Sequence, residues 1–270
     1  MNVWLAGVPG GGSMGSCKRE RELNLLWDKR LWSYYHLIET NGKMTEDKKI
    51  NLFLDSGAFS AWTQGVSINI REYISFIKEH EEVIEIYANL DVIGIGGKQP
   101  NQLTAEMTLK NQHIMEKAGL HPIPVFHYGE PISFLENYVK NYDYLALGVA
   151  GNSGVKLIPW LDVLFSKHIC DEKGMPKLKI HGFAVTSLPL MLRYPWYSVD
   201  STSWVITGRL GSIYIPRFRS GEWIYDEQSW KIAVSNRSGH KRSWSTYLHP
   251  FKKRAGNPLK LYSQQRLCFG

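Results

Sequence analysis

Short apolar runs alternate along this chain with stretches of helical periodicity, and this alternation is the feature that most limits how it can fold. Alternating strands and helices are typical of α/β folds, in which helices connect parallel strands. Eight apolar runs suit strands, so the sequence predicts a single-domain (β/α)8 TIM barrel. An open doubly wound sheet is the alternative, but it would need fewer strands and a G-x-G-x-x-G fingerprint, which this sequence lacks. The predicted strands are residues 2–8, 51–55, 83–91, 121–126, 144–148, 178–183, 196–199 and 212–215, and the predicted helices are residues 19–39, 70–80, 103–118, 132–140, 157–168 and 187–194.

Three of the apolar runs end in an aspartate, namely Asp55, Asp91 and Asp200. In a barrel all the strand ends meet on one face, so we expect these carboxylates to share a rim with His127 and His181. Each aspartate alone could cap a turn and each histidine could be structural, but three carboxylates at one rim repel one another and raise at least one pKa. Such a set suits proton transfer, nucleophilic attack at an acetal-like carbon, or a divalent metal ion.

Positive charge is concentrated at the C-terminal end of the chain. The net charge is +7, and residues 216–270 alone carry eleven Lys/Arg against three Asp/Glu. Tryptophans and other aromatic residues are interleaved with these cations, which is typical of a surface that binds a polyanion, although a merely solvated basic face is the alternative. The sequence therefore predicts a barrel domain over residues 1–215 and a basic extension over residues 216–270. The predicted nucleic-acid contacts are Arg209, Arg217, Arg219, Lys241, Arg242, Lys252, Lys253 and Arg254.

Cysteine usage and the N-terminus indicate a cytoplasmic protein. Cys17, Cys170 and Cys268 are scattered and odd in number, which favours a reducing compartment and offers no paired spacing for zinc. The N-terminal segment has no basic stretch and too short an apolar run for a signal peptide, and no window is apolar enough to span a membrane. We expect neither a cofactor nor a bound metal ion.

An ordered set of motifs between about Asn51 and Gly208 resembles the tRNA-guanine transglycosylase superfamily, whose members are (β/α)8 barrels. The family motif D-S-G-G-F-Q is matched here with alanine in place of the second glycine and serine in place of the glutamine. The matching segments are Asp55-Ser56-Gly57-Ala58-Phe59-Ser60, Ala88-Asn89-Leu90-Asp91, His127, Leu147-Gly148-Val149-Ala150-Gly151, and His181-Gly182-Phe183-Ala184-Val185 followed by Asp200.

The resemblance implies a role for each matching residue. Asp200 would be the nucleophile, Asp55 the general acid and base, and Asp91 the acceptor of hydrogen bonds from the purine base. His127 would contact the base where the family usually has glutamine. The remaining implied base contacts are the backbone of Gly148 and Val149, the motif residues Ser56 and Gly57, and the aromatic rings of Phe59 and Tyr128, or Trp204, for stacking.

The departures from the family point to DNA as the substrate. Members that act on tRNA usually carry a zinc subdomain after the nucleophile, whereas this chain has only Cys268 there. It is more similar to the phage-type DNA 7-deazaguanine transglycosylases, which exchange guanine in DNA for a 7-deazaguanine such as a preQ0 derivative and so protect phage DNA from restriction. A phage-encoded chain would act in the host cytoplasm, without a membrane, and a homodimer is left open.

Three other functions are left open by the residues. The substrate could be tRNA rather than DNA. The chain could be a non-catalytic nucleic-acid-binding barrel. It could also be a metal-dependent barrel hydrolase whose ligands would be Asp55, Asp91, His127, His181 and Asp200, although the tight H-x-H spacing common in such sites is absent.

Overall fold

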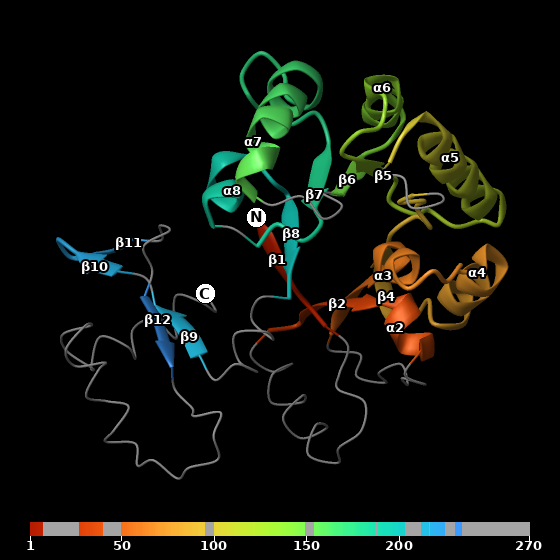
Figure 1. Cartoon of the computed structure of the whole chain (residues 1–270), viewed down its shortest axis with the longest axis horizontal. Helices are drawn as coiled ribbons and strands as arrows, with labels where there is room; N and C mark the ends of the chain where they lie inside the picture. The colour runs from red at the N-terminus through yellow and green to blue at the C-terminus, as the bar shows by residue number, and fades with distance from the viewer. Residues whose placement is uncertain are drawn as a thin grey trace, which may run out of the picture. The chain divides into compact units, whose positions relative to one another are not determined.

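The computed structural model of this chain describes residues 1–7, 27–39, 50–94, 100–148, 154–186, 188–202, 212–215, 217–224 and 230–233 (Figure 1). The chain forms two compact units, Met1–Ser201 and Thr202–Gly270. The division falls at Ser201, earlier than the predicted boundary at residue 215. No helix among the described residues is both long and apolar enough to cross a membrane.

The first unit is an α/β structure built on one eight-stranded sheet in which every strand pair is parallel. Its strands follow the order β4-β3-β2-β1-β8-β7-β6-β5. Consecutive residues are buried in β2, β3 and β6, as expected for a parallel sheet that is covered on both faces. Their bounds are β1 Asn2–Ala6, β2 Lys29–Ser33, β3 Asn51–Asp55, β4 Ile84–Tyr87, β5 Val125–His127, β6 Tyr144–Gly148, β7 Lys179–Gly182 and β8 Ser198–Ser201.

The sheet is strongly curled. Phe53 on β3 and His181 on β7 are separated by three strands in the sheet order, yet their ring centroids lie 4.7 Å apart. The two outer strands also approach each other, since Ala88, just after β4, forms a parallel bridge with Ile123, just before β5. Side chains of several strands, including Trp4 and Phe53, therefore pack into one cluster on the inner face of the sheet.

Helices connect the successive strands from β2 to β8 and cover the outer face (Figure 1). Two apolar clusters join them to the sheet, one around β2–β4 and one around β6–β8. Asn101 begins α5 with a capping box, since its side chain accepts from the backbone N–H groups of Leu103 and Thr104. The helices are α2 Tyr34–Glu39, α3 Ala58–Thr63, α4 Ile70–Glu79, α5 Gln102–Lys117, α6 Ile132–Asn141, α7 Gly154–Val163, the π-helix η1 Leu164–Ile169, and α8 Leu188–Arg193.

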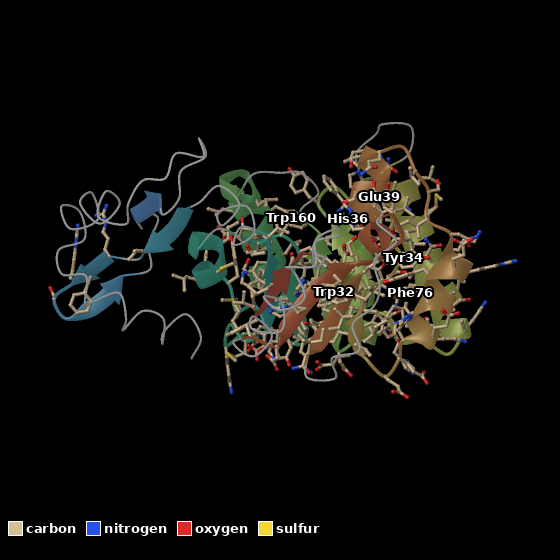
Figure 2. The ribbon with its side chains drawn as sticks, turned by 90° about the horizontal axis from the view of Figure 1, so that it is seen from below. Trp32, Tyr34, His36, Glu39, Phe76 and Trp160 are labelled. Atoms are coloured by element: carbon tan, nitrogen blue, oxygen red, sulfur yellow. The ribbon has the colours of Figure 1, made fainter. Side chains whose placement is uncertain are left out.

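The prediction of one helix over residues 19–39 is wrong at residues 29–33 and confirmed at residues 34–39, whereas residues 19–26 lie outside the described ranges. Lys29–Ser33 is β2, which pairs with β1 on one side and β3 on the other. Leu31 and Trp32 are adjacent and both buried, as expected for a strand covered on both faces. The helix α2 begins only at Tyr34, whose ring packs against Phe76 of α4, with centroids 5.0 Å apart (Figure 2).

The prediction that residues 212–215 form the last strand of the barrel is also wrong. This segment is β9 Ser212–Ile215, which pairs antiparallel with β12 Trp230–Ala233 in a separate two-stranded sheet of the second unit. The second unit also contains the hairpin of β10 Arg217–Arg219 and β11 Glu222–Ile224. The main sheet has eight strands, as predicted. The set differs, because it includes β2, which was not predicted, and lacks residues 212–215.

Candidate functional site

The predicted aspartates lie at the C-terminal ends of strands. Asp55 is the last residue of β3, Asp200 lies on β8, and Asp91 follows β4. Burial and the negative charges of Asp91 and Asp200 raise the pKa of Asp55 to about 8, against the opposing effect of the backbone N–H groups of Gly57 and Ser56. The three carboxylates are therefore close enough to act on one another. At neutral pH Asp55 is mostly protonated and can donate a proton.

Gly57 allows the turn after β3 to fold back onto Asp55. Its backbone N–H donates to Oδ2 of Asp55 at 3.1 Å. Gly57 adopts a φ of 75°, and a Cβ there would collide with the side chains of Ser33 and Tyr35. The motif requires glycine at this position for both reasons. Ser60, in the place of the family's glutamine, lies with its Oγ 3.4 Å from Nε2 of His36.

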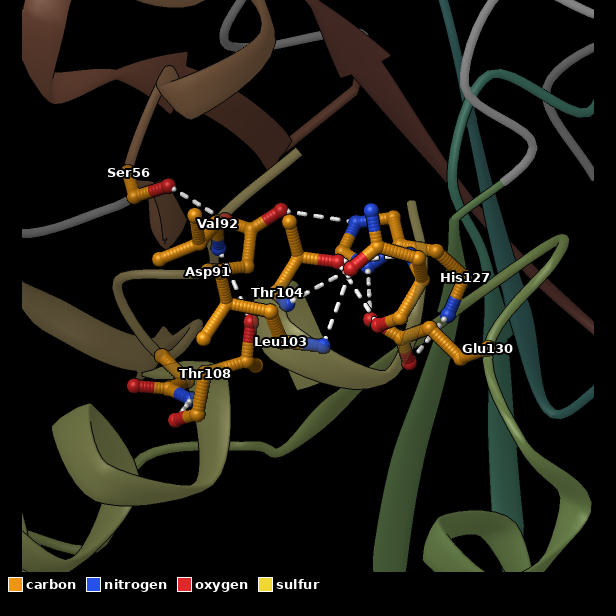
Figure 3. Close-up of polar contacts among 10 residues, drawn as sticks. Ser56, Asp91, Val92, Leu103, Thr104, Thr108, His127 and Glu130 are labelled. Carbon is orange, nitrogen blue, oxygen red and sulfur yellow. Dashed lines mark hydrogen bonds and ion pairs between the residues drawn. The ribbon is translucent and has the colours of Figure 1, made fainter. Parts of the chain in front are cut away.

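Asp91 belongs to a buried polar chain that runs from Ser56 through His127 to Glu130 (Figure 3). The Ser56 hydroxyl donates to Oδ1 of Asp91 at 2.9 Å, and Oδ2 of Asp91 lies 2.8 Å from Nε2 of His127. The Nδ1 of His127 lies 3.2 Å from Oε1 of Glu130. Both ring nitrogens of His127 are thus engaged by protein carboxylates, whereas the resemblance implied a contact with the base.

The segment that carries Asp91 is anchored to α5. The side chain of Asn89 donates to the carbonyl of Thr108 at 2.9 Å, and the backbone N–H of Val92 donates to the Thr108 hydroxyl at 2.9 Å. Asn89 and Thr108 are fully buried. These bonds fix the backbone on both sides of Asp91, so its carboxylate is held by the fold before any ligand arrives.

Gly148, the last residue of β6, lies directly against His127. A Cβ on Gly148 would collide with Cδ2 of His127 and lie 2.8 Å from its Nε2. In the structure, Gly148 leaves room for the ring of His127. This reason for glycine is independent of the backbone contact with the base that the resemblance implied. Val149, its predicted partner in that contact, lies outside the described residues.

Asp200 is held by a second polar chain. Its Oδ1 accepts from the backbone N–H of Ala184 at 2.8 Å and lies 3.3 Å from Nε2 of His181. The Nδ1 of His181 lies 2.7 Å from the Ser198 hydroxyl, which in turn lies 2.6 Å from the hydroxyl of Tyr144. His181 is fully buried, so it supports the site from beneath rather than facing a ligand.

Two aromatic residues that follow the strand ends are exposed, and a cleft reaches one of the three aspartates. Phe59 is 43% exposed and Tyr128 is 41% exposed, so both rings predicted to stack on a base are accessible. A cleft of about 470 Å³ reaches Asp91 between α3 and α5. Its mostly apolar wall includes Trp62, Ile68, Leu90, Ile93 and Met107. Trp204, the other predicted stacking residue, is outside the described part of the chain.

The predicted nucleic-acid contacts are described in part. Arg217 and Arg219 both lie on β10, two residues apart, and so point to the same face of the hairpin. Ser220 and Gly221 form its turn with φ values of 50° and 88°, which is typical of a tight hairpin. The predicted contacts outside the described residues are Arg209, Lys241, Arg242, Lys252, Lys253 and Arg254.

The sequence missed several residues that complete the site. Glu130 and Ser198 are buried polar residues whose partners are His127 and His181. Glu130 follows a predicted strand end by only a few residues, which was the available signal. Ser198 lies inside a strand and gave none.

Comparison with protein-family models gives no match, and comparison with curated proteins gives none either. Within the described ranges, no group of three or more His, Cys, Asp and Glu side chains is arranged to hold a metal ion.

Proposed function

We propose that this chain is a DNA-guanine transglycosylase, which exchanges guanine in DNA for a 7-deazaguanine such as preQ0 or a derivative. The observation that carries the proposal is the pairing of two unlike carboxylates at the strand ends. The pKa of Asp55 is raised to about 8 by burial and by its acidic neighbours, while Asp200 accepts a hydrogen bond from the Ala184 N–H. One carboxyl group is thus suited to proton transfer and the other to nucleophilic attack.

The reaction divides into two displacements. Asp200 attacks C1′ of the deoxyguanosine, so that an Asp200–C1′ ester bond forms while the bond from C1′ to the base breaks. The electron pair of that bond leaves with guanine, which takes a proton from Asp55. The incoming 7-deazaguanine then gives its proton to Asp55 and attacks C1′, and Asp200 leaves as a carboxylate. A covalent intermediate replaces one difficult step by two easier ones.

The remaining residues would bind and orient the base. The Asp91 carboxylate would accept hydrogen bonds from the N1–H and amino groups of the purine. The exposed rings of Phe59 and Tyr128 would stack on its faces. The target nucleotide must leave the duplex, which costs a few kcal/mol, and the basic residues 216–270 would offset this by binding phosphates.

The curled parallel sheet supports the finer fold proposal, a complete (β/α)8 barrel. The eight strands follow the cyclic order of such a barrel, and the Ala88–Ile123 bridge lies where the last gap would close. The basic segment and the absence of a cysteine cluster after Asp200 favour DNA over tRNA. Modified bases would then protect phage DNA from restriction.

The test is base exchange in a polymer. Duplex DNA or unmodified tRNA is incubated with the protein and a radiolabelled 7-deazaguanine, and label in the polymer is counted. We expect label in DNA, at least 10³-fold less with Asp200→Asn, and unchanged label with Asp162→Asn, which alters an exposed carboxylate paired with Arg193. Label found only in tRNA would show that the substrate is tRNA and not DNA. DNA binding without label for any base would favour the non-catalytic barrel.

A further inference from the structure

Glu130 has a buried carboxyl group, and both of its oxygens contact the same residue, His127. Its side chain is 1% exposed, on the turn that follows β5. Oε2 accepts from the backbone N–H of His127 at 3.0 Å, and Oε1 lies 3.2 Å from Nδ1 of the same histidine. A carboxyl group buried this deeply is costly unless its oxygens have hydrogen-bond partners, and His127 supplies a partner to each of them.

The ring of His127 has a second carboxylate on its other side, since Nε2 lies 2.8 Å from Oδ2 of Asp91. A neutral imidazole carries one N–H and can donate to only one of these partners, whereas an imidazolium donates to both. Burial lowers the pKa of His127, but the hydrogen bonds and charges of Asp91 and Glu130 outweigh it and raise this pKa to about 10.

The charges that act on His127 are those of Asp91 and Glu130, both negative. Tyr138 of α6, Tyr73 of α4 and Asp55 of β3 are titratable groups near this chain, and the pKa of each is raised by burial first and then by the negative charge of Glu130 or Asp91. On the remaining side the ring lies against the backbone of Gly148, which has no side chain to donate or accept.

We propose that Glu130 is a positioning residue that holds His127 as an imidazolium, so that the second N–H of the ring fixes the Asp91 carboxylate. His127 is then unavailable as a base-contacting donor, and Asp91 meets the ligand as an oriented anion whose remaining lone pairs accept from it. The part that concerns the ligand rests on the proposed function, whereas the charge state of His127 does not depend on it.

The charge state is tested by nitrogen NMR of protein labelled with ¹⁵N-histidine, with the His127 signal identified by its loss in His127→Gln. We expect both ring nitrogens of His127 to be protonated at neutral pH and to titrate near 10. In Glu130→Gln the midpoint should fall by more than one unit, because the charge is removed and the shape is kept. Glu136→Gln is the matched control, since Oε1 of Glu136 lies 3.2 Å from Nδ1 of the partly exposed His168, and it should leave His127 unchanged.

A single protonated nitrogen on His127 in the unaltered protein at neutral pH would overturn the proposal, and so would an unchanged midpoint in Glu130→Gln. The measurement on the unaltered protein decides even if the variant does not fold. In base exchange, Glu130→Gln should raise KM for the base about tenfold with a smaller change in kcat, because a charge-assisted contact that orients Asp91 is weakened. A loss confined to kcat would contradict a positioning role. If the unaltered protein exchanges no base, the proposed function fails while the NMR result still tests the role of Glu130.

Discussion

Nε2 of the fully buried His181 lies 3.3 Å from Oδ1 of Asp200, across the neighbouring strands β7 and β8. The other ring nitrogen is engaged by Ser198, so the orientation of the ring is fixed from behind. In the proposed reaction, the hydrogen bond from the Ala184 N–H and the nearby imidazole would orient this carboxylate, so that it would lose little entropy on attack. For this reason the proposed reaction assigns nucleophilic attack to Asp200 and proton transfer to Asp55.

Replacing His181 by phenylalanine should therefore impair catalysis more than binding. His181→Phe keeps a planar aromatic ring but leaves the Ser198 hydroxyl without this partner, and we expect a loss of about 1–3 kcal/mol in the free energy of unfolding. In base exchange, kcat should fall about tenfold or more with KM little changed, measured by steady-state kinetics. His168→Phe, at a partly exposed histidine, is the control. Unaltered kcat in a folded His181→Phe protein would limit His181 to a structural role.

The raised pKa of Asp55 predicts a specific dependence on pH. Between its ordinary value of 3.8 and about 8, the folded protein holds a proton on Asp55 that the unfolded chain has lost. Stability therefore falls as pH rises through this window, and the full cost of the buried charge is present above pH 8. Asp55→Asn removes that cost. The free energy of unfolding of the variant, measured in urea, should therefore rise relative to that of the unaltered protein as the pH increases from 5 to 9. A difference that is constant with pH would mean that Asp55 is ionised throughout.

Ala184 is a non-glycine residue with a φ of 54°, and its N–H donates to Asp200. A left-handed conformation costs alanine about 1–2 kcal/mol, part of which glycine would regain at the expense of a more flexible unfolded chain. We expect Ala184→Gly to raise the free energy of unfolding by about 0.5–1 kcal/mol, measured by thermal denaturation. Ala105→Gly in α5, a buried alanine inside a helix, should instead lower it by about 1 kcal/mol. Destabilisation in both variants would contradict strain at Ala184.

Gly148 should not tolerate a side chain. Gly148→Ala places a methyl group against the ring of His127, which cannot move without breaking its contacts with Asp91 and Glu130. We expect a loss of about 1–3 kcal/mol in unfolding free energy and a higher KM for the base. Gly65→Ala is the steric control, because no atom lies within 4 Å of a Cβ there, although its positive φ still carries a backbone cost. A loss in Gly148→Ala no larger than that in Gly65→Ala would show that the contact with His127 adds no steric cost.

The strands that the sequence predicted well are those whose C-terminal end is marked by a distinct residue type. The strands at residues 51–55 and 144–148 are confirmed as β3 and β6, because an uninterrupted apolar run ends there at a carboxylate or a glycine. The strand β2 was missed because α2 begins at the next residue, Tyr34, with no turn residue between them to separate strand from helix.

The candidate site divides in the same way. Asp55, Asp91 and Asp200 could be found because strand ends are visible in a sequence and all gather at one edge of a parallel sheet. The sequence could not reveal that His127 pairs with Glu130 or that His181 pairs with Asp200. Which ring nitrogen meets which carboxylate depends on how the side chains pack. The roles of all these residues in base exchange stay predictions.

The β10 hairpin predicts how nucleic-acid binding should depend on salt. Arg217 and Arg219 lie on the same face of the strand, and each phosphate that the protein ceases to neutralise should lower the slope of log K against log salt by about 0.9 for duplex DNA. Replacing both by alanine should therefore weaken binding to every duplex sequence alike and lower the slope by about 2, measured by fluorescence anisotropy from low to moderate salt. The matched control replaces two exposed cations of α4, Arg71 and Lys78, and should leave the slope unchanged. Equal changes in the two double variants would assign the effect to net charge, whereas weaker binding to one duplex sequence only would mean that the hairpin reads bases.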